Sequence, residues 1–191
     1  MGREDARPVT ADVNAKAKDR VLQVLDSHRL MSLATNRPDG WPQATMVGYV
    51  NDTFLIYCFV ATHSQKRANI VRDPRVSVAI GNDAPHPMGV SGLSLAGRAW
   101  VVDDRKEMAW VSRLRLKRYP EYGQFRDGAA AARVAPEPSP GAVTLLRIEP
   151  EIFSLIDYSK SFGHSELITF SERDLDRHLA TQMHRWDGQA L

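Results

Sequence analysis

The sequence predicts a mainly β domain, a six- to seven-stranded antiparallel β-barrel, closed or split, with flanking helices. Three runs rich in β-branched and aromatic residues follow one another between residues 30 and 60, with only turns between them. Consecutive strands with such short connections form an antiparallel meander rather than a parallel sheet with helical crossovers. Further β-rich runs recur later in the chain. Gly92 and Gly97 interrupt the fifth run, where a barrel needs a bulge or a bend.

Length and composition describe one ordinary globular domain. The chain has 191 residues, 43% hydrophobic and 25% charged, which is enough for one well-buried domain and short for two. The net charge of +2 is too small to favour a nucleic-acid partner. No apolar run reaches the ~20 residues of a membrane helix, and the polar N-terminus does not resemble a secretory signal. With Cys58 as the single cysteine, we expect a cytoplasmic protein without disulfides.

The N-terminal third is predicted to hold one helix and a hairpin. Residues 1–10 are polar and are expected to be disordered. A helix from Ala11 to His28, capped by Thr10 or Asp12, is predicted because apolar residues recur at helical spacing: Val13, Ala17, Val21, Val24 and Leu25. The next two strands are joined by a turn whose proline and glycine suit a tight reversal. These strands are Leu30–Asn36 and Pro42–Val50, and a third follows at Thr53–Val60.

The rest of the barrel domain, taken as residues 11–160, is predicted from later runs. Strands are expected at Val76–Ile80, Ser91–Val102, Val143–Ile148 and Ile152–Tyr158, the last two divided by Glu149–Pro150. A helix from Asp103 to about Tyr119 ends in basic residues, which we interpret as compensation of the helix dipole. A proline- and alanine-rich insert spans 119–141. A C-terminal extension, 161–191, is expected to contain a helix from Ser171 to Arg185.

The turn after the third strand has the residues of an anion site. Ala61-Thr62-His63-Ser64 leads into a helix predicted from Gln65 to Arg72, with Ser64 as its N-cap. The first turn of a helix carries free N–H groups and the positive end of its dipole, so it can hold a phosphate. Lys66 and Arg67 add positive charge. The alternative is an ordinary capped helix with solvated basic residues.

Other reaction chemistries have no support in the sequence. The motifs GxGxxG, GxxxxGK[ST] and HExxH are absent, which argues against a Rossmann dehydrogenase, a P-loop enzyme and a zinc protease. A single cysteine and scattered histidines give no metal-ligand spacing, so no protein-bound metal is expected.

Four segments together resemble one known family. These are DGWPQATMV, the strand ending at Tyr57, SQKRANIVRDPRVSVAI and SLAGRAWVVDD. They are similar to the pyridoxamine 5′-phosphate oxidase-like, flavin-binding split-barrel family, over about 30–104 and more loosely over 143–159. The resemblance implies a Greek-key split barrel that binds FMN at a homodimer interface, with two cofactors per dimer and residues from both chains. It matches Lys66 to the phosphate lysine and Ser64 to the serine two residues before it.

The resemblance also implies where the flavin ring lies. Thr45, Met46 and Val47 match the strand along the ring, and Ser91 matches the region that reaches the partner's cofactor. The full set of predicted cofactor residues is Thr45, Met46, Val47, Tyr57, Cys58, Thr62, Ser64, Gln65, Lys66 and Ser91. From the residues alone, Met46, Val47 and Tyr57 are also compatible with plain barrel core.

Two departures argue against oxidation of pyridoxamine phosphate itself. Ala44 or Gln43 stands where oxidases of that type begin the strand motif with arginine, and the C-terminal arginine–histidine motif has no clear match. The chain is more similar to the general-stress-protein or uncharacterised branch of the family. We therefore expect FMN-dependent electron or hydride transfer on a small molecule. The alternatives are the deazaflavin F420 on the same fold, a non-enzymatic flavin-binding stress protein and, more weakly, haem binding.

Overall fold

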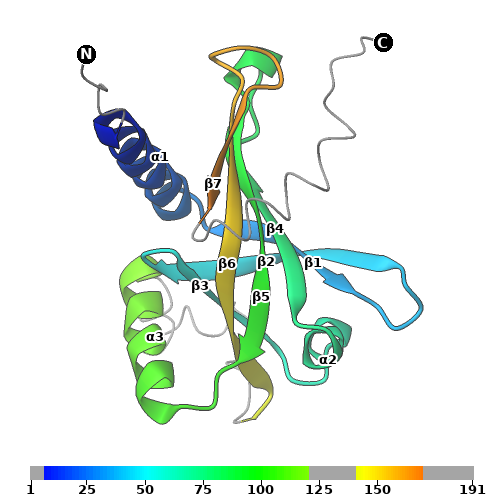
Figure 1. Cartoon of the computed structure of the whole chain (residues 1–191). Helices are drawn as coiled ribbons and strands as arrows, with labels where there is room; N and C mark the ends of the chain where they lie inside the picture. Colours follow the sequence, from blue (N-terminus) through cyan, green and yellow to red (C-terminus); the bar gives the residue numbers. More distant parts are fainter. Residues whose placement is uncertain (1–6, 121–140, 170–191) are drawn as a thin grey trace, which may run out of the picture.

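The computed structural model describes residues 7–120 and 141–169. Its strands form one antiparallel sheet, ordered β3-β2-β1-β4-β5-β6-β7, and pairing of β3 with β6 closes the first six into a barrel (Figure 1). The order β4-β1-β2-β3 is that of a Greek key. The predicted split barrel with flanking helices is confirmed. The strands are β1 (Leu30–Asn36), β2 (Pro42–Asp52), β3 (Leu55–Ala61), β4 (Arg75–Gly81), β5 (Ser91–Val101), β6 (Val143–Asp157) and β7 (Ser165–Thr169).

Strand β6 is long and changes partner part-way. Residues 143–148 pair with β3 and residues 152–156 with β7, while β5 lies along the other edge. The register against β5 shifts between Ala96 and Gly97, opposite Pro150. A proline is tolerated at such a bulge because its missing N–H is not needed there. The prediction of two strands divided at Pro150 is therefore wrong: the chain bends and continues as one strand.

Gly97 is required at this bulge. An added Cβ would lie 2.4 Å from the carbonyl oxygen of Glu149 and 3.0 Å from the Cα of Pro150. Both contacts are with backbone, which cannot rotate away, so only glycine lets β5 and β6 come this close. The bend predicted within the fifth strand is confirmed here.

Three helices of the described ranges surround the barrel: α1 (Arg7–Ser27), α2 (Gln65–Arg72) and α3 (Arg105–Arg118), with a short 3₁₀ turn, η1 (Pro87–Gly89). Helix α1 buries Ala17, Val21 and Leu25, as its periodicity predicts. It begins at Arg7, so Thr10 and Asp12 lie inside it, and the prediction of either as its cap is wrong. Helices α2 and α3 lie on opposite sides of the lower end of the barrel in Figure 1.

The main core lies inside the barrel and is covered by α1. The Tyr49 hydroxyl donates a hydrogen bond to the carbonyl oxygen of Leu25 at 2.8 Å, and burial raises the pKa of Tyr49 above its ordinary value. A smaller cluster lies between α3 and the strands next to it. It contains Val50, Tyr57, Val102, Val111 and Leu145. No helix in the described ranges is long and apolar enough to cross a membrane.

Two predicted features fall largely or wholly outside the described residues. The proline-rich insert, 119–141, is described only at its two ends, and the predicted helix Ser171–Arg185 is not described at all. Strand β7 is absent from the sequence prediction, since its five residues are too few to show a periodicity.

Candidate cofactor site

The turn that follows β3 is built as a helix N-terminus. Ser64 has extended backbone angles, φ −74° and ψ 147°, and its hydroxyl accepts a hydrogen bond from the Arg67 N–H at 3.4 Å. The Ser64 N-cap and the helix bounds Gln65–Arg72 are confirmed. The Arg67 N–H is thus taken by the cap, whereas the N–H groups of Gln65 and Lys66 have no acceptor within the helix and can donate to an anion.

Thr62 fixes this turn to the start of β6. Its hydroxyl donates to the carbonyl oxygen of Gly141 at 2.7 Å, and its N–H donates to Ala142 at 2.9 Å. The hydroxyl hydrogen is therefore engaged within the protein. Its oxygen also forms a hydrogen bond with the Thr144 hydroxyl at 3.1 Å, so Thr62 shapes the turn.

Lys66 and Arg67 bring positive charge that the described residues do not neutralise. Both side chains are half-buried, and neither has an ion-pair partner in the described part of the chain. The Arg67 Nε is shielded from solvent and has no hydrogen-bond partner there. A buried donor without an acceptor costs free energy. An anionic group bound at this turn would supply both charge and acceptor oxygens.

Cys58 lies beneath the turn and is fully buried. Burial raises the pKa of its thiol to about 12, and the nearby Lys66 charge acts in the opposite direction. Cys58 packs in the core and offers no reactive thiolate near neutral pH.

Strand β2 has an edge beside this turn that no strand of the described ranges pairs. Residues 42–48 pair with β1, whereas pairing with β3 begins only at Tyr49. The Tyr49 N–H donates to Arg29 on the β1 side. Because backbone groups alternate along an antiparallel strand, Ala44, Met46 and Gly48 direct their N–H and C=O groups to the unpaired edge. The backbone at Met46 is thus available to the polar edge of a flat ring.

The side chains of β2 divide between the core and the surface. Met46 is 64% exposed, so the alternative that it belongs to the barrel core is wrong. Val47 packs against the main core. The Thr45 hydroxyl is shielded from solvent and has no hydrogen-bond partner in the described residues. An orphaned hydroxyl beside a free strand edge fits a site that receives a polar ligand.

A family comparison decides what this arrangement belongs to. The family model described as pyridoxamine 5′-phosphate oxidase matches residues 17–156. The chain belongs to this family. It is 30% identical to general stress protein 26 of Bacillus subtilis (strain 168) over 99 residues, which are 51% of this chain and 69% of that protein.

Solved structures of the pyridoxamine 5′-phosphate oxidase fold agree with the barrel. A putative pyridoxamine 5′-phosphate oxidase from Listeria innocua has a TM-score of 0.56 and 20% identity, covering 74% of this chain and 98% of that one. A haem-binding protein from Mycobacterium smegmatis has a TM-score of 0.61 and 21% identity, covering 80% of this chain and 57% of that one. At these identities the likeness concerns the fold.

Two of the residues predicted for the cofactor lie apart from the turn. The Tyr57 hydroxyl points to α3 and donates to Glu107 Oε1 at 3.0 Å; burial, then this bond, raises the pKa of Tyr57 to about 12. Ser91 is the first residue of β5. The start of β4, which follows α2, pairs with Arg98 near the far end of β5, so Ser91 lies at the end of β5 that is remote from α2. Within one chain, neither side chain comes together with Lys66.

An unpredicted hydrogen-bond network lies behind the turn. Asn69, fully buried in α2, donates from Nδ2 to Thr35 Oγ1 at 2.9 Å and to Gln43 Oε1 at 3.1 Å. Its Oδ1 accepts from Gln65 Nε2 at 2.9 Å. The one sequence signal was an asparagine inside a short helix, where the residue is a poor helix former. That signal does not reveal which strands the side chain joins.

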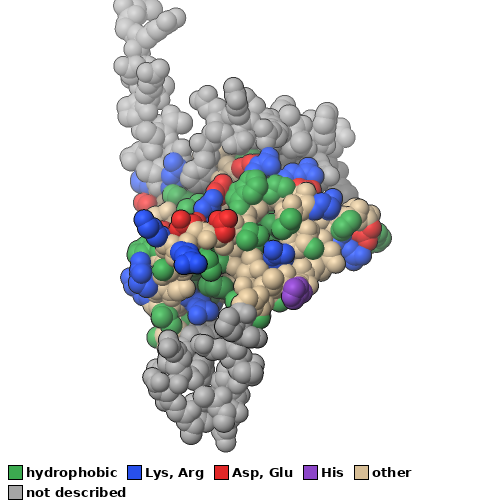
Figure 2. Space-filling model, turned by 90° about the horizontal axis from the view of Figure 1, so that it is seen from below, with side chains coloured by type: hydrophobic (Ala, Val, Ile, Leu, Met, Phe, Trp, Pro, Cys, Tyr) green, Lys and Arg blue, Asp and Glu red, His purple; other side chains and the backbone are tan. Residues whose placement is uncertain are grey.

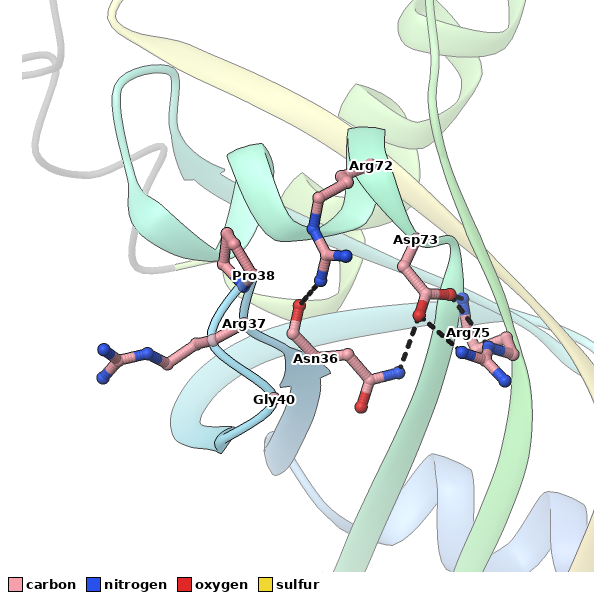
Figure 3. Close-up of a pocket in the computed structure, with 7 residues that line it drawn as sticks. All are labelled: Asn36, Arg37, Pro38, Gly40, Arg72, Asp73 and Arg75. Carbon is pink, nitrogen blue, oxygen red and sulfur yellow. Dashed lines mark hydrogen bonds and ion pairs between the residues drawn. The ribbon is translucent and has the colours of Figure 1, made fainter.

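A pocket lies at the other end of α2 (Figure 3). It measures about 460 Å³ and is bordered by basic side chains that already have partners. Arg75 forms two hydrogen bonds with Asp73, at 2.9 and 2.7 Å, and Arg72 donates to the carbonyl oxygen of Asn36 at 2.7 Å. The Arg72 contact, with the bond from Asn36 Nδ2 to Asp73 Oδ2 at 3.0 Å, holds the end of β1 to the end of α2. The pocket is thus separate from the cofactor residues.

Proposed function

We propose that this protein binds FMN, with the phosphate at the first turn of α2 and the ring along the free edge of β2. The observation that carries the proposal is the charge of Lys66 and Arg67 at a capped helix start, which no described residue neutralises, beside a strand edge that no described strand pairs. A helix N-terminus favours a phosphate through its N–H groups and dipole. Lys66 adds a charge-assisted hydrogen bond.

The β2 edge suits the other end of the cofactor. Met46 offers a backbone donor and acceptor, while Thr45 offers an unpartnered hydroxyl on the same strand. When bound, FMN supplies hydride or electron transfer, and the protein supplies position, electrostatics and exclusion of water. The proposed activity is therefore flavin-dependent oxidation or reduction of a small molecule by a cytoplasmic enzyme. Ala44 and Gln43 carry no charge, so a phosphorylated substrate is not expected to bind through its phosphate at this part of β2.

We propose further that the site is completed by a second copy of the chain. Among the described residues of one chain, no strand covers the β2 edge at 42–48, and Trp41 and Met46 of the β1–β2 hairpin are 71% and 64% exposed. That hairpin projects from the barrel in Figure 1, and Figure 2 shows hydrophobic side chains gathered on one face with basic ones around them. Covering an edge and an apolar face favours a homodimer. Ser91, distant from Lys66 in its own chain, would then reach the partner's cofactor.

Lys66→Ala tests the phosphate assignment. Loss of a charge-assisted hydrogen bond is expected to weaken FMN binding about tenfold or more, or about 1.5–3 kcal/mol. Binding is measured by titration of flavin fluorescence. Arg72→Ala is the matched control, because it removes a basic side chain from the same helix at its other end. An Lys66→Ala protein that is folded and keeps FMN affinity within about twofold contradicts the assignment.

The absorption spectrum of the purified protein separates FMN from the other ligands considered. FMN gives a yellow protein that bleaches on reduction with dithionite, F420 absorbs further to the blue, and haem gives an intense Soret band. Haem is included because a structurally similar protein is named as haem-binding. Steady-state assays with NADH and NADPH distinguish an oxidoreductase from a flavin-binding stress protein, since full FMN occupancy without turnover supports binding alone.

A further inference from the structure

Asn69 is a polar side chain in a position where an apolar one would ordinarily pack. It is 0% exposed, and Thr35, one of its partners, is 2% exposed. Both amide hydrogens and the amide oxygen of Asn69 have partners, in Thr35, Gln43 and Gln65. A buried amide group is tolerated only when its N–H and C=O groups all have hydrogen-bond partners. These hydrogen bonds then fix the neighbouring residues in one arrangement.

The network joins three elements at the place where the two halves of the proposed site meet. Asn69 lies on α2, Thr35 on β1 and Gln43 on β2. Among the hydrogen bonds of the described residues, the bond from Asn69 to Gln43 is the link between α2 and β2. Gln43 precedes Thr45 by two positions, so both side chains lie on the same face of β2. The Asn69 carboxamide therefore connects α2, where the FMN phosphate is proposed to bind, to β2, where the flavin ring is proposed to lie.

Packing alone does not require this residue. Helix α2 is already anchored by Ile70, which is 2% exposed, and the N–H of the C-cap Asp73 bonds to the Asn69 carbonyl oxygen. An apolar side chain at position 69 would bury as well as Ile70 does and would need no partners. The carboxamide adds directional bonds, which fix distance and orientation rather than burial.

We infer that Asn69 is a positioning residue, which sets the spacing between the phosphate-binding turn and the flavin-contacting strand. This inference rests on the proposed function. A ligand that spans both parts, such as FMN, gains from the fixed spacing because its second contact forms without further ordering cost. Riboflavin, which lacks the phosphate, contacts only the ring strand and gains nothing from it. The ratio of the two dissociation constants therefore reports the positioning.

The experiment measures FMN and riboflavin binding to the whole chain and to three variants. Asn69→Leu replaces the carboxamide by an apolar group of similar size. Gln43→Met removes only the link to β2, at a half-buried position that tolerates the change. Ile70→Val is the matched control, since it removes one buried methyl from the same helix without touching the network. Dissociation constants come from fluorescence titration, and melting temperatures are recorded in parallel.

The expected result is that the preference for FMN over riboflavin falls about tenfold in Asn69→Leu and in Gln43→Met. In Ile70→Val the preference is unchanged, although the melting temperature is lower. If both network variants lower the melting temperature but keep the wild-type preference, Asn69 is merely structural and the inference is wrong. If Asn69→Leu does not fold, Gln43→Met alone decides. A wild-type protein that does not prefer FMN overturns the phosphate assignment and, with it, this inference.

Discussion

The Thr45 hydroxyl is a single polar group that works against the stability of the ligand-free chain. It is shielded from solvent without a hydrogen-bond partner in the described residues, whereas its neighbour Val47 packs against the core. Unsatisfied buried groups of this kind persist in proteins where function uses them. At the scale of one residue, stability and ligand binding therefore place opposite demands on position 45.

Thr45→Val tests this conflict. Valine has the shape of threonine without the hydroxyl, so the free energy of unfolding without ligand is expected to rise by about 1 kcal/mol. Affinity for FMN is expected to fall, because the cofactor loses a partner. Urea denaturation with and without FMN measures both effects. A variant that is destabilised without ligand, or that binds FMN as tightly as the original, contradicts this account of Thr45.

A cluster of charges lies at the turn end of the β6–β7 hairpin. Glu166 accepts hydrogen bonds from Lys160, from His164 at 3.1 Å and from Arg20 of α1 at 3.0 Å. These contacts, led by Lys160, lower the pKa of Glu166 to about 2, below its ordinary value of 4.5. A carboxyl group whose pKa is lowered on folding stabilises the folded state above its ordinary pKa, and this stabilisation is lost as the pH falls toward the folded value.

Glu166→Gln is therefore expected to destabilise the protein at pH 7 and not at low pH. The effect is about 1 kcal/mol or less, since the cluster is partly exposed and screened by solvent. The difference between the two proteins should shrink as the pH falls from 4.5 toward 2. Urea denaturation at pH 7, 5 and 3 measures it. A difference that stays constant over this range means that Glu166 contributes through packing and not through its charge.

At the scale of elements, the sequence predicted best where turn and cap residues agree with the periodicity. Strand β1 and helix α2 have the predicted bounds, and the Ser64 cap is in place. Strand β6 was divided wrongly because Pro150 looks like a strand end, and only the facing Gly97 shows that it occupies a bulge. Pairing between distant segments decides such cases, and local patterns do not contain it.

The candidate site was predictable only in part, because some of its contacts join segments that are distant in the sequence. The turn at Ser64 and Lys66 is local and could be read from composition and spacing. The direction of Tyr57 toward Glu107, and the contacts of Asn69 with β1 and β2, depend on partners 26 to 50 residues away in the chain. The open edge of β2 likewise follows from where β3 stops pairing, which no single strand reveals.

At the scale of the whole molecule, the barrel brings a helix start and a free strand edge together and leaves both open on one side. The proposed homodimer closes that side and brings Ser91 of the second copy to the cofactor. The pocket at the other end of α2 is not the proposed cofactor site, because it is bordered by arginines that already bond to Asp73 and Asn36. A binding site shared by two copies need not be a pocket in one.

A crystal structure of the protein with FMN tests the central claim most directly. The account predicts a dimer with two cofactors, each phosphate within hydrogen-bond distance of the Lys66 ammonium and of the first N–H groups of α2, and each ring along β2 at Met46. A phosphate bound instead among Arg37, Arg72 and Arg75 at the other end of α2, or a ring that does not touch β2, would contradict it.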